Sequence, residues 1–185
     1  MTRVKEIREN DDASEDIHLV LDKLKESYNG RIVGPYRVLL YKPSLAEVVC
    51  NTADQIRKET TLESEIRELV TIIVARQIDC VYVWSAHQPG ALQSGVPIEV
   101  IDSIEKKHEI NYKLLSNRQR IAVDFTNELI KNNRVSDQLF DDAQKTFGIE
   151  GVVDLASTIG QYYMLGSVLN SFEVDPDPDR PVLSV

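Results

Sequence analysis

The stretch from Thr60 to Gly95 constrains the fold more than any other part of the chain. Its first half carries apolar residues at helical spacing, which predicts an amphipathic helix with one buried face. These apolar residues are Leu62, Ile66, Leu69 and Ile73. Glu68 lies beside this stripe, so its carboxylate is expected to turn toward the interior, where a charged group needs a partner.

The second half of this stretch places a thiol and an imidazole on one predicted helix. Cys80, Val83 and His87 fall at i, i+3 and i+7, so they share a helical face. Cys80 and His87 would lie about 10.5 Å apart along the helix axis. A second helix is needed to bring a partner between them, and the helix that carries Glu68 is the candidate.

Helix start and stop signals recur along the rest of the chain. Ser14 predicts the cap of a first helix, residues 34–43 form an apolar segment between Gly and Pro breakers, and Asp79 predicts the cap of the helix that follows it. Capping-box pairs stand at Ser44 with Glu47, Thr60 with Glu63, and Ser116 with Gln119. No run alternates with period two for long enough to demand a strand. The sequence therefore predicts an all-α fold of about seven or eight helices.

Length and charge limit the domain organisation and the partners. No linker-like stretch divides the chain internally, so we expect a helical domain at residues 14–174, an N-terminal arm at 1–13 and an extended, acidic, proline-rich tail at 175–185. The chain has 21 Lys and Arg against 30 Asp and Glu, a net charge of −9. Nucleic acids are bound mainly by clustered basic residues, so no nucleic-acid partner is expected, and a small-molecule substrate is.

Residues 155–172 carry no formal charge and approach the roughly 20 residues that a bilayer span needs. Polar side chains are nevertheless spread around every face, and each would be costly in hydrocarbon, so no membrane partner is expected. The segment is interpreted as a central buried helix or a subunit interface. No apolar leader follows Met1, and two cysteines are too few for a disulfide framework, so a cytoplasmic location is expected.

The central stretch also carries a family motif. The pattern E-L-x-x-x-x-V-A-R, Cys, Y-x-W-x-x-H and A-x-x-x-G is matched by Glu68-Leu69, Val74-Ala75-Arg76, Cys80, Tyr82, Trp84, His87 and Ala91 to Gly95. The segments at residues 34–47 and 152–174 extend the match. On these residues the chain resembles carboxymuconolactone decarboxylase-like proteins of the alkylhydroperoxidase D-like superfamily.

The resemblance implies a single-domain alkylhydroperoxidase D-like helical fold that forms homo-oligomers, from dimers to trimers or hexamers. It implies a cofactor-independent lyase that removes CO2 from a small molecule, an aromatic-degradation lactone or acid. Loss of CO2 would leave a carbanion equivalent that a lactone carbonyl delocalises and a protonated histidine quenches. His87 is then the proton donor, Glu68 its orienter or partner acid/base, and Cys80 the third site residue. Arg76 is the only cation of the motif near this site.

One position departs from the superfamily pattern. The superfamily site combines a Glu, a C-x-x-C pair and a His, but Val83 occupies the second Cys position. A two-thiol peroxidase needs that second sulfur to resolve the sulfenic acid, so this mechanism is disfavoured. A helix N-terminus lowers the pKa of a thiol, so a single-thiol redox protein acting through Cys80 is one alternative. A non-catalytic oligomeric ligand-binding protein, in which Cys80 only packs, is the other.

Glu68 and His87 fit an acid/base pair, because a carboxylate on an apolar helix face either finds a partner or stays protonated. A buried structural bridge between the two side chains is the alternative interpretation. Tyr82, Val83 and Trp84 are the expected substrate-pocket residues around them. One Glu, one Cys and one His do not form a familiar closed ligand set, so no metal and no cofactor are expected.

Overall fold

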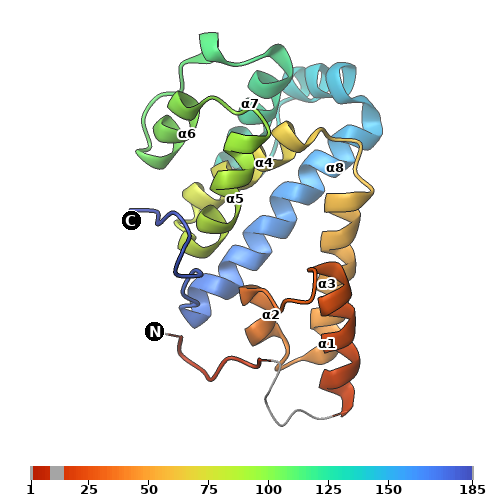
Figure 1. Ribbon diagram of the computed structural model, residues 1–185. Helices are drawn as coiled ribbons and strands as arrows, with labels where there is room; N and C mark the ends of the chain where they lie inside the picture. The colour runs from red at the N-terminus through yellow and green to blue at the C-terminus, as the bar shows by residue number, and fades with distance from the viewer. Residues whose placement is uncertain (1, 9–14, 185) are drawn as a thin grey trace.

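The computed structural model describes residues 2–8 and 15–184. In this part of the chain the regular structure consists of helices, with no strand, which confirms the all-α prediction (Figure 1). The helices are α1 (Glu15–Ser27), α2 (Gly34–Leu39), α3 (Pro43–Lys58), α4 (Ser64–Gln77), α5 (Val81–Gln93), α6 (Ile98–Glu105), the 3-10 helix η1 (Tyr112–Leu114), α7 (Asn117–Asn132) and α8 (Asp137–Phe172). The predicted cap Ser14 lies outside the described residues. No helix of the described chain combines the length and the hydropathy that a bilayer crossing requires.

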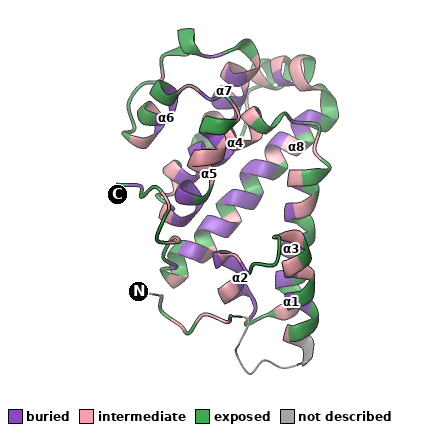
Figure 2. Ribbon diagram, viewed as in Figure 1, coloured by how far each residue is buried: buried purple, intermediate pink, exposed green. Residues whose placement is uncertain are grey.

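Helix α4 lies at the centre of the core, because its middle is apolar on almost every side. Residues 69–75 are all buried, and a helix that is apolar all round is stable only when other elements enclose it. It packs against α5, α7 and α8. Figure 2 shows buried residues along α8 and along the helices that lie against it. Glu68 is the residue directly before this buried stretch.

Helix α8 crosses the molecule diagonally and contacts α2, α3, α4, α5 and α7 (Figure 1). Gly148 interrupts it with φ +72° and ψ 171°, a backbone conformation that glycine adopts without steric cost. The parts of α8 on either side of Gly148 form one element with a break between them. The uncharged segment 155–172 is the second part, and Leu155, Ile159 and Leu169 on it are buried.

Two of the predicted capping boxes are wrong. Helix α3 begins at Pro43, one residue before Ser44, and has no side-chain cap, because proline at the first turn has no N–H to satisfy. Helix α4 begins at Ser64 and also has no side-chain cap. The Thr60 hydroxyl donates instead to Asp154 of α8 at 3.0 Å, so a tertiary hydrogen bond replaces the local one.

Asp79 is not the cap of α5 either. Cys80 is the N-cap, and Asp79 adopts a left-handed conformation with φ +49°. Its carboxylate pairs with Arg76 and, at 3.0 Å, with Lys107. The capping box of Ser116 and Gln119 at α7 is confirmed, with both reciprocal hydrogen bonds present. Within the apolar segment 34–43, residues 34–39 form the short helix α2.

Both ends of the described chain pack back onto the helices. The Arg3 N–H donates to the Phe172 carbonyl at 2.9 Å, and the Ile7 N–H donates to the Arg37 carbonyl at 2.9 Å. Residues 175–184, here called the C-terminal tail, contain no helix, but Leu183 within them is only 1% exposed. Figure 1 shows the tail returning along the molecule beside α5 and α8. The tail is therefore part of the folded structure and reaches the site.

Candidate active site

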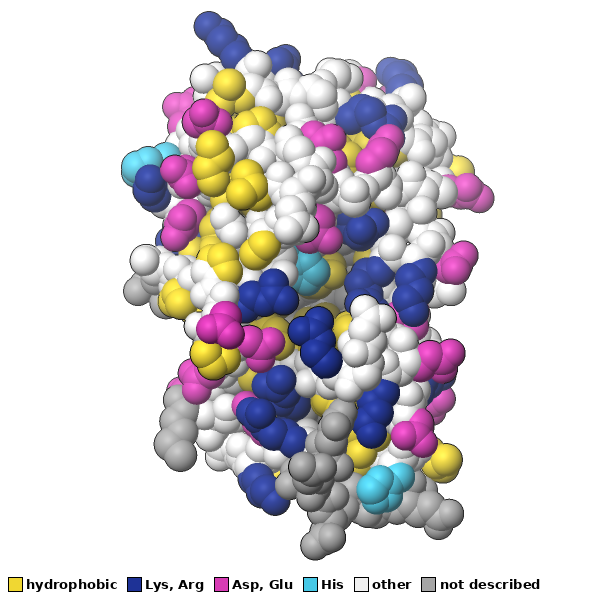
Figure 3. Space-filling model, viewed as in Figure 1, with side chains coloured by type: hydrophobic (Ala, Val, Ile, Leu, Met, Phe, Trp, Pro, Cys, Tyr) yellow, Lys and Arg dark blue, Asp and Glu magenta, His cyan; other side chains and the backbone are white. Residues whose placement is uncertain are grey.

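A cavity of about 140 Å³ opens between α3, α5 and α8. The loop after α1 and the C-terminal tail complete its wall. The lining residues are Tyr28, Arg31, Val33, Pro35, Ala53, Ile56, Arg57, Tyr82, Val83, Ser85, Ala86, His87, Gln161, Tyr162, Leu165, Leu169, Pro176, Asp177 and Arg180. Figure 3 shows the hollow on this face, with a histidine inside it and Lys or Arg side chains around its rim.

His87 lies in the cavity wall, and Glu68 lies behind it. His87 Nδ1 is 2.8 Å from Glu68 Oε2, and the two side chains are only 21% and 17% exposed. The structure therefore brings together the acid and the imidazole that the sequence places on separate helices, α4 and α5. The His87 ring also packs edge-on against Tyr162, with ring centroids 4.7 Å apart and an interplanar angle of 78°.

The charge state of Glu68 fixes the direction of this hydrogen bond. Burial alone would raise the pKa of Glu68, but the hydrogen bond from His87 and the positive charges of His87, Arg67 and Arg57 hold that pKa below its usual value. Glu68 is therefore ionised at neutral pH and can only accept, so His87 donates its Nδ1–H. The second ring nitrogen, Nε2, is left to exchange a proton with a bound molecule.

Two glycines permit the close contacts that shape the site. A Cβ at Gly90 on α5 would lie 3.1 Å from Glu68 Oε2, so glycine at this position leaves room for the carboxylate. A Cβ at Gly34 would lie 2.3 Å from the Tyr82 ring, and the Gly34 N–H donates to the Tyr82 hydroxyl at 2.7 Å. An isolated glycine inside a helical pattern is the sequence signal that could have pointed to the first contact.

Cys80 does not line the cavity. It is fully buried at the N-terminus of α5, and a Cβ at Gly166 of α8 would lie 3.4 Å from the Cys80 Cβ. Burial raises the pKa of the Cys80 thiol, and this exceeds the lowering effect of hydrogen bonds from the Val83 and Tyr82 backbone N–H groups. At neutral pH the thiol is therefore protonated and packed, in contrast to an exposed reactive thiolate.

Of the three expected pocket residues, two line the cavity and one does not. Tyr82 and Val83 line the cavity, whereas Trp84 is 1% exposed and packs in the core outside it. Val83 occupies the position at which the superfamily pattern has its second cysteine. In this chain an apolar side chain therefore faces the cavity at that position.

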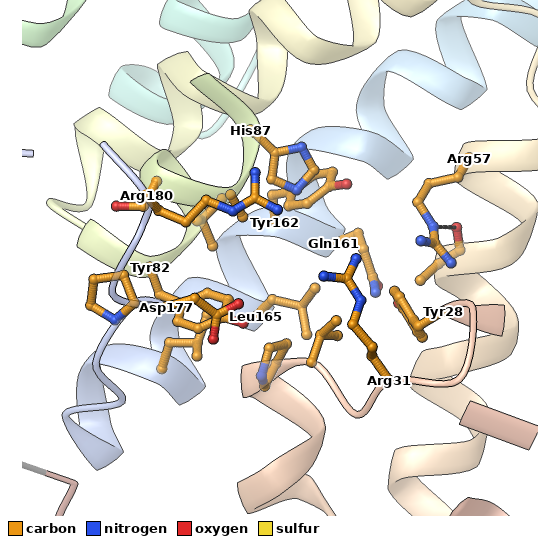
Figure 4. Close-up of a pocket in the computed structure, with 18 of the residues that line it drawn as sticks. Tyr28, Arg31, Arg57, Tyr82, His87, Gln161, Tyr162, Leu165, Asp177 and Arg180 are labelled. Atoms are coloured by element: carbon orange, nitrogen blue, oxygen red, sulfur yellow. Dashed lines mark hydrogen bonds between the residues drawn. The ribbon is translucent and has the colours of Figure 1, made fainter. Parts of the chain in front are cut away.

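Three arginines line the cavity, and none of them belongs to the motif. Arg31 follows α1, Arg57 lies on α3, and Arg180 lies on the C-terminal tail. Figure 4 shows Arg31 and Arg180 pointing into the cavity, toward the side where His87 and Tyr162 lie, and Arg57 at its far edge. The motif cation Arg76 does not take part, because its Nε donates to the Glu105 carbonyl at 2.7 Å and its guanidinium pairs with Asp79.

Further polar groups complete the wall. The Ser85 side chain is fully buried, and its hydroxyl has no hydrogen-bond partner among the described residues. The Gln161 side chain donates to the Val49 carbonyl at 3.4 Å. The described residues contain no group of three or more His, Cys, Asp or Glu side chains that could hold a metal ion. With His87, its partner Glu68 and three arginines, the site offers proton transfer and anion binding from its own side chains.

No protein-family model matches the sequence, and no curated protein matches it either. Solved structures do match. An uncharacterized peroxidase-related protein from Silicibacter sp. TM1040 is 15% identical with a TM-score of 0.74, covering 96% of this chain and 93% of that one. A cysteine-to-alanine variant of the debrominase Bmp8 in complex with 2,3,4-tribromopyrrole is 13% identical with a TM-score of 0.73, covering 96% and 93%. An alkylhydroperoxidase AhpD core protein from Ralstonia eutropha JMP134 is 18% identical with a TM-score of 0.70, covering 90% and 87%.

These likenesses establish the fold. The chain has the alkylhydroperoxidase D-like all-helical fold, as the sequence predicts. The similar structures include a debrominase and peroxidase-related proteins, so this fold hosts more than one chemistry. The activity of this chain therefore depends on the side chains of its own site.

Proposed function

We propose that the protein is a cofactor-independent lyase of the carboxymuconolactone decarboxylase type, which removes CO2 from a small organic acid. The hydrogen bond between His87 and Glu68, in the wall of a cavity lined by arginines, is the observation that supports this most strongly. A structural bridge alone would not require the His87 ring to face a cavity.

The reaction follows from the chemistry of this pair. The bond between the carboxylate carbon and its neighbour breaks, CO2 leaves, and the electron pair stays on the substrate as an enolate delocalised over a carbonyl group. Protonated His87 then transfers its Nε2 proton to carbon and becomes neutral, and solvent returns a proton to it. Glu68 remains ionised throughout, so it orients the ring and stabilises the imidazolium form.

The cavity charge also suits this substrate class. Guanidinium groups bind carboxylates through paired, charge-assisted hydrogen bonds. Arg31, Arg57 and Arg180 therefore explain how an acidic protein could hold an anionic molecule, for which the motif itself offers only Arg76.

A thiol route has less support. Cys80 is buried outside the cavity, its pKa is raised by burial, and Val83 replaces the second cysteine of the superfamily pattern. Single-thiol redox chemistry through Cys80 is therefore the weaker alternative. Non-catalytic ligand binding is the other alternative, and only an activity measurement separates it from the lyase.

The test is CO2 release from a panel of small carboxylated lactones, measured with the wild type, with His87→Asn and with the control His108→Asn. His108 is exposed, so its substitution controls for the loss of one imidazole. Loss of a general acid lowers turnover by about 10²- to 10⁴-fold, so we expect that loss in His87→Asn alone. The lyase proposal fails if the wild type releases no CO2 from any member of the panel, or if His87→Asn keeps full activity.

A further inference from the structure

Arg31 and Arg180 both line the cavity, and both keep an uncompensated charge. In the described part of the chain, neither guanidinium group forms an ion pair or a hydrogen bond. By contrast, Arg37 pairs with Glu6 and Asp177, and Arg118 pairs with Glu63 at 2.9 Å. Two uncompensated cations point into the same cavity in a protein whose net charge is −9 (Figure 4).

Arg57 adds a third cation whose position is fixed. Its guanidinium pairs with Asp54 at 2.7 Å, its Nε donates to the Ala53 carbonyl at 3.2 Å, and it stacks 4.2 Å above the centre of the Tyr28 ring. Asp54 also accepts a hydrogen bond from Ser27 at 2.7 Å, so the carboxylate itself is held in place. A side chain fixed in this way loses little conformational freedom when a ligand binds.

The cavity lining itself holds little negative charge. Among the described residues that line the cavity, Asp177 is the only carboxylate, and it lies 3.5 Å from Arg37. Glu68 lies behind His87 and is engaged with it. Asp54 neutralises Arg57, so the net positive charge of the cavity comes from Arg31 and Arg180. The three arginines of the cavity wall are here called the arginine site.

The proposed reaction determines which group of a substrate would bind at the arginine site. A carboxylate that leaves as CO2 loses its charge in the transition state, so an ion pair to it would stabilise the bound acid more than the transition state and would slow the step. Arginines are useful when they hold an anionic group that stays on the molecule. The arginine site is thus suited to anchoring, while His87 works on another part of the same ligand.

The C-terminal tail is what completes the arginine site. Val174 and Leu183, which flank Arg180, are 6% and 1% exposed, so the tail is attached to the core on both sides of it. Between them, the Arg180 N–H donates to the Asp177 carbonyl at 3.2 Å, and Asp177 is tied to Arg37. The tail thus presents Arg180 to the cavity from a fixed turn.

We infer that Arg31, Arg57 and Arg180 form a carboxylate-anchoring site, in which the C-terminal tail contributes the residue that closes the cavity over the ligand. This inference rests on the proposed function for the role of the anchored group, but binding alone tests it. The ligand class is a small organic anion with a carboxylate that is separate from the reacting centre.

The experiment measures binding of trans,trans-muconate, its monomethyl ester, its dimethyl ester and inorganic phosphate by titration calorimetry. Muconate serves as a planar diacid probe. We expect affinity to fall from the diacid to the monoester to the neutral diester, and phosphate to bind more weakly than the diacid. Arg31→Gln and Arg180→Gln should each weaken diacid binding about tenfold, the loss of one charge-assisted contact. Arg180→Lys, which keeps the charge, should recover part of the affinity.

The matched control is Arg134→Gln, which removes one positive charge at an exposed position outside the cavity and should leave the affinity unchanged. The inference is overturned if no anion binds, if the neutral diester binds as tightly as the diacid, or if phosphate is preferred. It is also overturned if Arg180→Gln has no more effect than Arg134→Gln. Because binding requires no turnover, a failed CO2 assay with an intact binding series would reject the lyase and retain the arginine site.

Discussion

The two reactive side chains of the motif lie two turns apart on helix α5, at its N-cap and at its middle, and their surroundings differ. At the N-terminal end, Cys80 is fully buried against Gly166 of α8, and its thiol pKa is raised. Two turns later, His87 lies in a cavity wall with an ionised partner behind it. One helix therefore serves close packing at its N-terminus and proton chemistry at its middle.

This difference shows that residues of one motif need not belong to one site. Spacing on a helix places Cys80 and His87 on a shared face, but the neighbouring helix decides what each of them meets. Gly166 lets α8 approach closely at the Cys80 end. At the His87 end α8 presents Tyr162, and the cavity remains beside it.

The largest effect is expected from a double-mutant cycle at Glu68 and His87. Glu68→Gln and His87→Asn should each lower turnover about 10²-fold or more, equivalent to about 2.7 kcal/mol, because the proton donor and its orienting partner work as a unit. The double variant should be no slower than the slower single variant. Turnover is measured beside thermal melts of all four proteins.

The melts separate catalysis from structure in this cycle. If the pair were only a structural bridge, each single variant would lose about 3 to 5 kcal/mol of stability and the double variant would regain it. Cys80→Ala is the matched control from the N-terminus of α5, and it should keep its turnover. Loss of activity in Cys80→Ala as large as in His87→Asn would contradict the assignment of Cys80 to packing and of His87 to proton transfer.

A smaller effect is expected from packing at the Cys80 end. In Gly166→Ala the new Cβ would lie 2.2 Å from Ile78 Cδ1, so neighbouring side chains must move, and we expect a loss of about 1 to 2 kcal/mol in unfolding free energy. Denaturant unfolding measures it. Gly160→Ala on the same helix meets nothing within 4 Å and should gain about 0.5 to 1 kcal/mol. Equal stabilities of the two variants would show that this end is not close-packed.

The smallest effect is a pH dependence at the His87 end. The pKa of Glu68 is lowered in the folded protein, so the ionised carboxylate stabilises the fold above its ordinary pKa of about 4.3. This contribution is lost as the pH falls through the lowered, folded-state value. The stability advantage of the wild type over Glu68→Gln should therefore shrink at acidic pH, as urea unfolding at a series of pH values would show. A stability advantage of the wild type that grows on acidification would contradict a lowered Glu68 pKa in the folded protein.

Much of the fold could be predicted from local patterns. Apolar spacing and stop signals locate the helices, and the Ser116 capping box holds because both of its partners lie within one turn. The prediction fails where a distant residue competes for the same group. Thr60 bonds to Asp154, which is 94 residues away, and no local rule contains that contact.

Only the site residues that belong to the motif could be predicted from the sequence. Glu68 and His87 were identifiable because an acid on an apolar face requires a partner. Arg31, Arg57 and Arg180 were not, since they come from three segments that meet only in the folded chain. The roles of the site residues, the homo-oligomer and the cytoplasmic location stay predictions.

The contact between Gly34 and Tyr82 has a consequence for how this cavity can change during evolution. The two residues are 48 positions apart, yet a Cβ at position 34 would overlap the Tyr82 ring, whose edge lines the cavity. A residue with a Cβ at position 34 therefore requires the Tyr82 ring to move from its place in the cavity wall. A substitution at position 34 is thus expected to reshape the cavity wall at position 82, so the two positions are coupled through this contact.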